Sequence, residues 1–153
     1  MMKLCSDLLK WLDGKSLVTA ESLTGGGIGM SITAIPGASK VFKGGVISYT
    51  DEIKREVLGV SQVDLDSFGA VSAPVAKAMA IGAKKLLNAD LAVSVTGLAG
   101  PEGDSFGHPV GTVFIGYADD RTVTALECHF SGDREAVRTQ TIEAALQIIF
   151  KYS

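Results

Sequence analysis

The stretch that most constrains the fold covers residues 17–30, where an apolar strand passes into a helix through three consecutive glycines. Glu21, Ser22 and Thr24 come directly before these glycines. A strand that ends in glycines and opens a helix aims backbone N–H groups at one point, which favours an anion or a developing oxyanion. The alternative is a tight turn in which the glycines only permit close packing.

Length and composition indicate a globular α/β chain with a single domain over residues 1–153. Hydrophobic residues make up 46% of the chain and charged residues 20%. The formal net charge is −3 and no basic face is evident, so we do not expect nucleic acid as a partner. The longest apolar runs, about seven residues, are too short to cross a bilayer, so we expect no membrane partner.

The cysteines and histidines predict neither a metal site nor a cofactor. Cys5 and Cys128 show no metal or disulfide spacing, which a reducing cytosol explains most simply. His108 and His129 form no ligand pair with them. The N-terminus lacks the apolar core of a signal peptide, so we expect a cytoplasmic protein.

The hydrophobic pattern predicts a three-layer α/β/α sandwich with a mixed β-sheet. Helices and strands alternate early and a hairpin comes late, which favours a mixed sheet over a purely parallel one. In the helix over residues 73–87 we expect Val75, Met79 and Leu86 on the buried face. The other helices are expected at residues 3–13, 25–34, 51–58 and from 134 to about 150, and the strands at 16–20, 41–49, 91–96, 110–118 and 122–130.

Three polar clusters follow predicted strands, at residues 21–24, 39–54 and 96–109. Ligands of open α/β sheets bind beyond the carboxyl ends of the strands. We therefore expect the clusters to converge on one site. Neither glycine-rich loop matches a dinucleotide or P-loop fingerprint, so a phosphate cradle here would consist of backbone N–H groups.

Lys54 is the leading candidate for a general base, because the chain offers no obvious histidine for this role. A lysine can act as a base when burial or a nearby cation lowers its pKa toward neutrality. The alternative is an ordinary solvated helix charge within Asp-Glu-Ile-Lys-Arg-Glu. Tyr49 is either a packed aromatic or a proton relay. Arg134 and Arg138, one helical turn apart, could form a phosphate clamp, although residues 131–134 could equally cap a helix and nothing more.

Seven short motifs, which together span nearly the whole chain, resemble the CinA C-terminal domain family and stand in its order. They lie at residues 19–26, 36–39, 46–54, 69–72, 96–101, 109–113 and 131–134. The family includes stand-alone nicotinamide mononucleotide deamidases, which hydrolyse the carboxamide to nicotinate mononucleotide and ammonia. Longer members carry an N-terminal domain resembling molybdopterin-binding proteins, so this chain looks like the stand-alone form.

The resemblance implies a serine/lysine amidase, with Ser22, Ser39, Tyr49 and Lys54 in the active site. Neutral Lys54 would take the hydroxyl proton while the serine attacks the carboxamide carbon. We expect Ser39 to be the partner of Lys54 and Ser22 to shape the pocket, with Ser22 as the alternative nucleophile. Tyr49 would relay a proton or orient the base.

The resemblance also implies a nucleotide substrate, bound without a metal or cofactor. Glycine-loop N–H groups would stabilise the oxyanion, and Arg134 with the loop at residues 96–100 would hold the 5′-phosphate. The expected substrate-binding residues are Glu21, Thr24, Gly25, Gly26, Thr96, Gly97, Ala99, Gly100 and Arg134.

Two residues depart from the family pattern. Leu23 stands where members often have cysteine, which argues against a thiol mechanism. His108 stands where many have lysine, and a mostly neutral histidine could replace that cation at a phosphate only in part.

Two other functions remain open: a catalytically silent nucleotide-binding or assembly module, and hydrolysis of a different nucleotide-linked amide. A homo-oligomer is expected, because the apolar fraction is high and a neighbour could complete the glycine loops.

Overall fold

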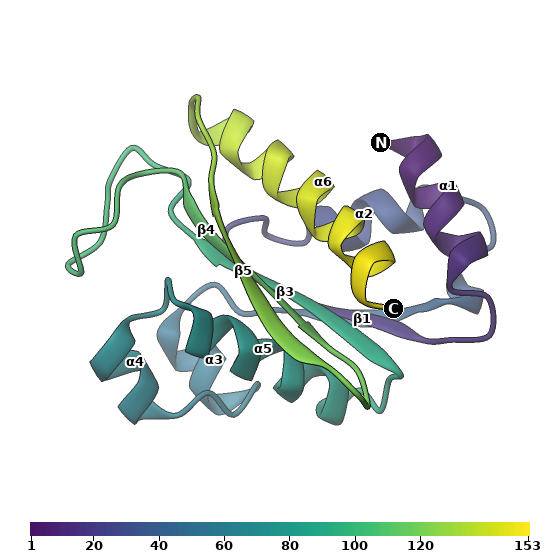
Figure 1. The fold of residues 1–153 in the computed structure, drawn as a ribbon, viewed down its shortest axis with the longest axis horizontal. Helices are drawn as coiled ribbons and strands as arrows, with labels where there is room; N and C mark the ends of the chain where they lie inside the picture. Colours follow the sequence, from purple (N-terminus) through teal and green to yellow (C-terminus); the bar gives the residue numbers. More distant parts are fainter.

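A five-stranded sheet in the order β2-β1-β3-β4-β5 forms the middle layer of the molecule (Figure 1). The structure, a computed structural model, describes residues 1–153. β1 pairs in parallel with β2 and β3, whereas β4 is antiparallel to both β3 and β5, so the predicted mixed sheet is confirmed. The strands are β1 (Leu17–Glu21), β2 (Phe42–Ile47), β3 (Leu91–Gly97), β4 (Thr112–Ala118) and β5 (Val123–His129).

Helices cover both faces of the sheet, as the expected three-layer sandwich requires (Figure 1). One face carries α1 (Met2–Trp11), α2 (Gly27–Thr33) and α6 (Arg134–Tyr152), and the other carries α3 (Asp51–Glu56), α4 (Gln62–Phe68) and α5 (Ala73–Leu86). A short 3-10 turn, η1 (Ala38–Lys40), precedes β2. None of the helices combines the length and the apolar character that crossing a membrane would need.

The alternation of side chains along β1 decides which layer each residue after the strand joins. Leu17 packs in the core on the α6 side, whereas Val18 and Ala20 pack in the core on the α5 side. Because alternate residues point to opposite faces, Glu21 shares its face with Leu17. The chain therefore leaves β1 with Glu21 turned toward α2.

Side-chain caps start the helices that border the carboxyl edge of the parallel strands. The hydroxyl of Thr50 accepts a hydrogen bond from the N–H of Ile53 at 3.3 Å, and the carboxylate of Asp133 accepts one from Ala136 at 2.9 Å. Each such cap is worth about 1 kcal/mol. Because Thr50 begins α3, β2 ends at Ile47, two residues earlier than we expected.

The helix α5 lies so close to the sheet that only small side chains fit between them. Ala76, Ala80 and Ala83 are buried on its inner face, whereas Leu86 is 53% exposed, so the expected position of Leu86 is wrong. The backbone of α5 contacts β3 through Ser94, whose hydroxyl donates to the carbonyl of Ala76 at 2.6 Å. Gly116 of β4 faces the same carbonyl with no room for a methyl group.

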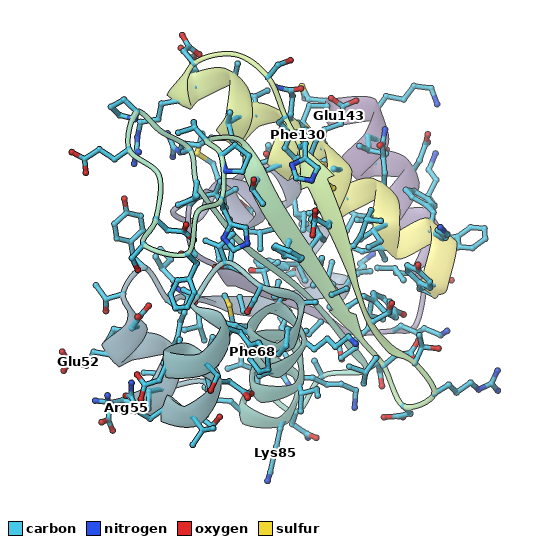
Figure 2. The ribbon with its side chains drawn as sticks, turned by 60° about the vertical axis from the view of Figure 1, so that its left-hand side comes forward. Glu52, Arg55, Phe68, Lys85, Phe130 and Glu143 are labelled. Carbon is cyan, nitrogen blue, oxygen red and sulfur yellow. The ribbon has the colours of Figure 1, made fainter.

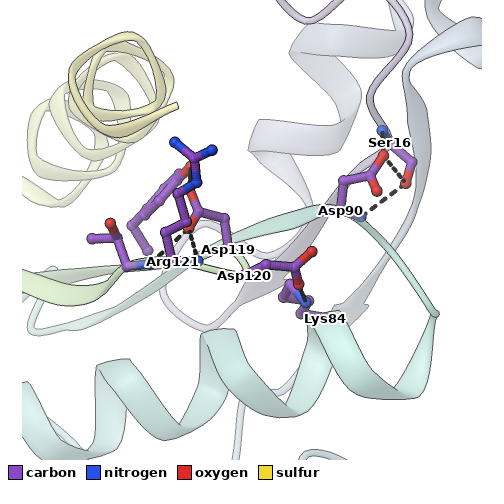
Figure 3. A network of polar contacts seen from close by, with 8 residues as sticks. Ser16, Lys84, Asp90, Asp119, Asp120 and Arg121 are labelled. Carbon is purple, nitrogen blue, oxygen red and sulfur yellow. Dashed lines mark hydrogen bonds and ion pairs between the residues drawn. The ribbon is translucent and has the colours of Figure 1, made fainter.

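At the opposite, amino edge of β1 and β3, polar contacts join the ends of several elements (Figure 3). The carboxylate of Asp90 accepts a hydrogen bond from the N–H of Ser16 at 2.8 Å. An ion pair of 2.7 Å joins Lys84 of α5 to Asp120 in the β4–β5 turn. These contacts lie at the edge of the sheet opposite to the carboxyl edge, where the functional site is predicted.

We predict that Gly116→Ala lowers the free energy of unfolding by about 2 kcal/mol, because its methyl group would overlap the backbone of α5. Urea denaturation at one protein concentration measures this change. Gly29→Ala is the matched control, since its methyl group meets only the tip of the Phe42 ring, at 3.2 Å. Equal stability changes in both variants would contradict the close approach of α5.

Candidate active site

Lys54 is turned into the protein beside Ser22, at the carboxyl edge of the parallel strands. Its side chain is 2% exposed, and its Nζ lies 3.0 Å from Ser22 Oγ and 2.8 Å from the carbonyl oxygen of Ser48. Ser22 follows β1 and Ser48 follows β2. Because these two strands are parallel neighbours, their carboxyl ends bring the three residues together.

The burial of Lys54 gives it the electrostatics of a base. Burial lowers the pKa of Lys54 to about 8, and the carboxylate of Asp51 on the same helix acts against this shift. Glu52 and Arg55 point outward into solvent (Figure 2). Among the charged residues of α3, Lys54 is therefore the one that is buried. When protonated, Nζ donates both hydrogen bonds; when neutral, its lone pair can accept the proton of the Ser22 hydroxyl.

The turn after Ser22 presents backbone N–H groups that are free to bind an anion. The N–H of Ser22 donates to Val95 of β3, and the N–H of Gly25 donates back to the carbonyl of Ser22, both at 3.1 Å. The N–H groups of Leu23, Thr24 and Gly26 donate to no acceptor within the chain. A turn of this kind next to a hydroxyl resembles an oxyanion hole beside its nucleophile.

Glu21 holds the start of α2, although we expected it to bind substrate. Its Oε1 accepts hydrogen bonds from Thr24 Oγ1 at 2.6 Å and from the N–H of Ile28 at 2.8 Å, and its Oε2 accepts one from Gly29 at 3.1 Å. A carboxylate is favourable at a helix N-terminus, where N–H groups lack partners. The side chains of Glu21 and Thr24 therefore bind each other and the start of α2, and neither side chain lines the pocket.

A pocket of about 370 Å³ opens in front of Ser22 and Lys54. Small-molecule sites commonly measure ~300–1,000 Å³, so this one fits a small substrate. Seven of the predicted site residues line it, whereas Gly25, Gly26 and Gly100 do not. The seven are Ser22, Tyr49, Lys54, Thr96, Gly97, Ala99 and Arg134.

Arg134, at the start of α6, connects two sides of this pocket. Its Nη1 donates to the carbonyl of Gly100 at 2.7 Å and its Nη2 donates to the hydroxyl of Tyr49 at 3.1 Å. Tyr49, which is 57% exposed, thus contacts Arg134, although we expected it to act on Lys54. The hydroxyl of Thr96 donates to Ala70 at 2.9 Å, so it braces the loop before α5.

Comparison with known proteins identifies the family. The family model described as "CinA C-terminal domain" matches residues 1–153. The chain belongs to this family. A CinA-like protein of Geobacter metallireducens is 51% identical over 133 residues, which are 87% of this chain and 32% of that relative. The chain thus spans about a third of the length of this longer relative.

Shorter relatives match along most of their length. The nicotinamide-nucleotide amidohydrolase PncC of Escherichia coli (strain K12) is 47% identical over 140 residues, which are 90% of this chain and 84% of that protein. A crystal structure of a CinA superfamily protein from Escherichia coli superimposes with a TM-score of 0.97 at 35% identity, and the match covers 99% of this chain and 90% of that one. The fold is therefore that of the CinA structures.

We expected Ser39 to lie next to Lys54, but the structure places these two residues apart. Ser39 is exposed in η1, before the amino end of β2, whereas Lys54 follows the carboxyl end of the same strand. A six-residue strand separates them by roughly 20 Å, at ~3.3 Å per residue. The serine that contacts Lys54 is Ser22.

Several pocket residues, most of them apolar, are absent from the predicted catalytic and substrate-binding residues. Phe106, in the β3–β4 loop, contacts Gly69 and lines the pocket. An exposed aromatic side chain in a glycine-rich loop was the signal that could have identified it. His108 in the same loop lies 2.7 Å from Asp104, outside the pocket lining. Of the other lining residues, Leu23, Asp51, Leu98, Asp104 and Ser105 fall within the predicted polar clusters, whereas Leu65, Gly69, Ala70 and Val71 fall outside them. No three histidine, cysteine or acidic side chains are grouped so as to hold a metal ion.

We predict that wild type gains about 2 kcal/mol of stability relative to Lys54→Met between pH 7.5 and pH 10. The folded pKa, about 8, lies below the ordinary value of 10.5. The unfolded chain therefore binds this proton more tightly, and the penalty for burying the charge disappears as pH rises through this interval. Urea denaturation of both proteins at each pH measures the difference. Lys77→Met, at an exposed position, is the control, and the stability difference between wild type and this variant should not change with pH. A stability difference between wild type and Lys54→Met that does not change with pH would refute the inferred pKa shift.

Proposed function

We propose that this chain hydrolyses the carboxamide of nicotinamide mononucleotide to nicotinate mononucleotide and ammonia. The observation that carries the proposal is the contact of buried Lys54 with the hydroxyl of Ser22 inside a pocket. The similarity to a nicotinamide-nucleotide amidohydrolase over 84% of that protein's length supports the choice of substrate. Such a reaction would recycle pyridine nucleotides.

In the first half-reaction, Ser22 is the nucleophile and neutral Lys54 is the general base. Lys54 Nζ takes the hydroxyl proton as Ser22 Oγ forms a bond to the carboxamide carbon, and the carbonyl oxygen becomes an oxyanion. The protonated Lys54 then gives this proton to the departing nitrogen. The carbon–nitrogen bond breaks, ammonia leaves, and nicotinate mononucleotide remains joined to Ser22 as an ester.

In the second half-reaction, water replaces ammonia at the same centre. Lys54 takes a proton from the water as its oxygen bonds to the ester carbon. The ester bond to Ser22 Oγ then breaks, and Lys54 returns the proton to that oxygen. A base whose pKa lies near 8 suits both directions of this transfer, because it is neither fully protonated nor too weak near neutral pH.

The turn after Ser22 would stabilise the oxyanion of both steps. The N–H groups of Leu23 and Thr24 have no acceptor within the chain and follow the nucleophile directly. In other enzymes one such donor is worth roughly 3 kcal/mol of transition-state stabilisation.

Arg134 would bind the 5′-phosphate at the opposite side of the pocket. Its guanidinium already contacts Tyr49 and Gly100, so its direction is set before the substrate arrives. The apolar side of the pocket, with Leu65, Val71 and Phe106, suits the pyridine ring.

We predict that Ser22→Ala and Lys54→Ala each lower ammonia release from nicotinamide mononucleotide by at least a thousandfold, because each removes half of the nucleophile–base pair. Ser39→Ala, the matched serine control, should retain activity within about threefold of wild type. A coupled ammonia assay with the purified proteins measures all three. Loss of activity in Ser39→Ala with retention in Ser22→Ala would refute the assignment. Binding without turnover in wild type would favour the silent nucleotide-binding module.

A second prediction concerns the phosphate. Arg134→Ala should raise KM for nicotinamide mononucleotide by about tenfold to a hundredfold, the loss expected for a charge-assisted hydrogen bond. The same variant should leave kcat/KM for nicotinamide riboside, which lacks the phosphate, within about threefold of wild type. Arg121→Ala, on the exposed β4–β5 turn, controls for loss of an arginine charge. Equal losses on both substrates would show that Arg134 does not bind the phosphate.

A further inference from the structure

Arg138 lies one turn beyond Arg134 on α6 and faces the turn that carries Ser22, outside the pocket lining. Its Nε donates to the carbonyl of Leu23 at 2.9 Å and its Nη2 donates to the carbonyl of Thr24 at 3.2 Å. It forms no ion pair with any carboxylate of the chain. Both of its contacts are therefore made to the backbone directly after the proposed nucleophile.

Arg138 is the donor to the carbonyl of Leu23, and at the carbonyl of Thr24 it adds to the hydrogen bond that the N–H of Gly27 donates at 3.0 Å, so it restrains two successive peptide groups. A peptide group is planar, and its N–H points opposite to its C=O. When Arg138 binds the carbonyl of Leu23, the N–H of Thr24 in the same peptide must point away from α6. When Arg138 binds the carbonyl of Thr24, the next N–H, that of Gly25, points back to Ser22, to which it donates at 3.1 Å.

Within this turn, the Leu23–Thr24 peptide has no other hydrogen bond in the chain, and glycines follow it. Gly25 and Gly26 both have positive φ values, 58° and 100°, in a region that glycine enters freely. A Cβ at Gly25 would lie 3.8 Å from Arg138 Nη2, so the guanidinium lies directly against this part of the turn. Without it, the Leu23–Thr24 peptide could rotate and withdraw the Thr24 N–H.

We propose that Arg138 is a positioning residue for amide hydrolysis, which holds the N–H of Thr24 in the direction that receives the oxyanion. It acts through the backbone of Leu23 and Thr24 and touches neither substrate nor Ser22 Oγ. Its positive charge at the carbonyl ends also polarises the two peptides, which makes their N–H groups stronger donors. The inference rests on the proposed function, since it needs an oxyanion formed on Ser22.

Arg138→Ala should lower kcat for nicotinamide mononucleotide by about a hundredfold, the usual effect of losing one oxyanion donor, with KM changed by less than threefold. Guanidinium ion added at millimolar concentration should raise the kcat of Arg138→Ala at least tenfold and leave the kcat of wild type unchanged. Arg138→Lys retains the charge but cannot bind both carbonyls as a guanidinium does, so its kcat should lie between those of wild type and Arg138→Ala. Arg121→Ala is the matched control.

A tetrahedral inhibitor separates this role from a general contribution to folding. Pyridine-3-boronic acid would form an adduct with Ser22 Oγ that carries an oxygen at the oxyanion position. In Arg138→Ala and Arg138→Lys, its Ki should rise in proportion to the loss of kcat, while Kd for the product nicotinate mononucleotide stays within threefold. If Arg138→Ala does not fold, Arg138→Lys alone decides the question.

Unchanged kcat in folded Arg138 variants would overturn the inference and leave the function intact. A loss of kcat with no change in the boronate Ki, or with an equal weakening of product binding, would also overturn it. Failure of the proposed function is seen separately, as full activity in Ser22→Ala or no turnover by wild type.

Discussion

The burial of Lys54 against Ser22 is the interaction on which the rest of the site depends. An ammonium group taken out of water is costly unless hydrogen-bond acceptors replace the water. The acceptors here are Ser22 Oγ and the carbonyl of Ser48, which come from two different strand ends. They meet because Glu21 pairs with Ile47 in the β1–β2 register. A shift of that register by one residue would turn Ser22 away from Lys54, so the contact between the two side chains exists only in the folded sheet.

The two helical layers divide the chemistry between them. On one face of the sheet, α3 contributes Lys54; on the other, α6 contributes Arg134 to the pocket and Arg138 to the turn behind it. The turn after β1 lies between these layers and receives side chains from both. This arrangement requires β1 to be an interior strand, with β2 and β3 on either side, because an edge strand would leave Ser22 without the Val95 carbonyl that binds its N–H.

Local patterns in the sequence predict most of the fold and part of the site. Hydrophobic alternation and strand-ending motifs indicate the mixed sheet and its carboxyl edge. They cannot choose between Ser22 and Ser39, because the contact with Lys54 joins residues 32 positions apart and depends on the strand register and on the rotation of α3. The period-2 pattern of β1 could have placed Glu21 on the α2 side, away from the pocket. The prediction for Leu86 is wrong for another reason: the buried face of α5 carries Ala76, Ala80 and Ala83, and Leu86, the last residue of the helix, is exposed. The homo-oligomer and the cytoplasmic location stay predictions.

Glu21 and Arg138 both bind the backbone of the turn and of the helix start that follows it, Glu21 through N–H groups and Arg138 through carbonyl groups. Glu21 takes the N–H groups of Ile28 and Gly29 at the start of α2, and Arg138 takes the carbonyls of Leu23 and Thr24. The positive end of α2 is thus already neutralised by a carboxylate of the chain. A second anion there would meet that carboxylate, which is consistent with the proposal that a substrate phosphate binds Arg134 instead. The N–H groups of Leu23 and Thr24, next to Ser22, remain without an acceptor in the chain. Under the proposed mechanism, the same two side chains that stabilise the turn would leave its remaining N–H donors available for the oxyanion.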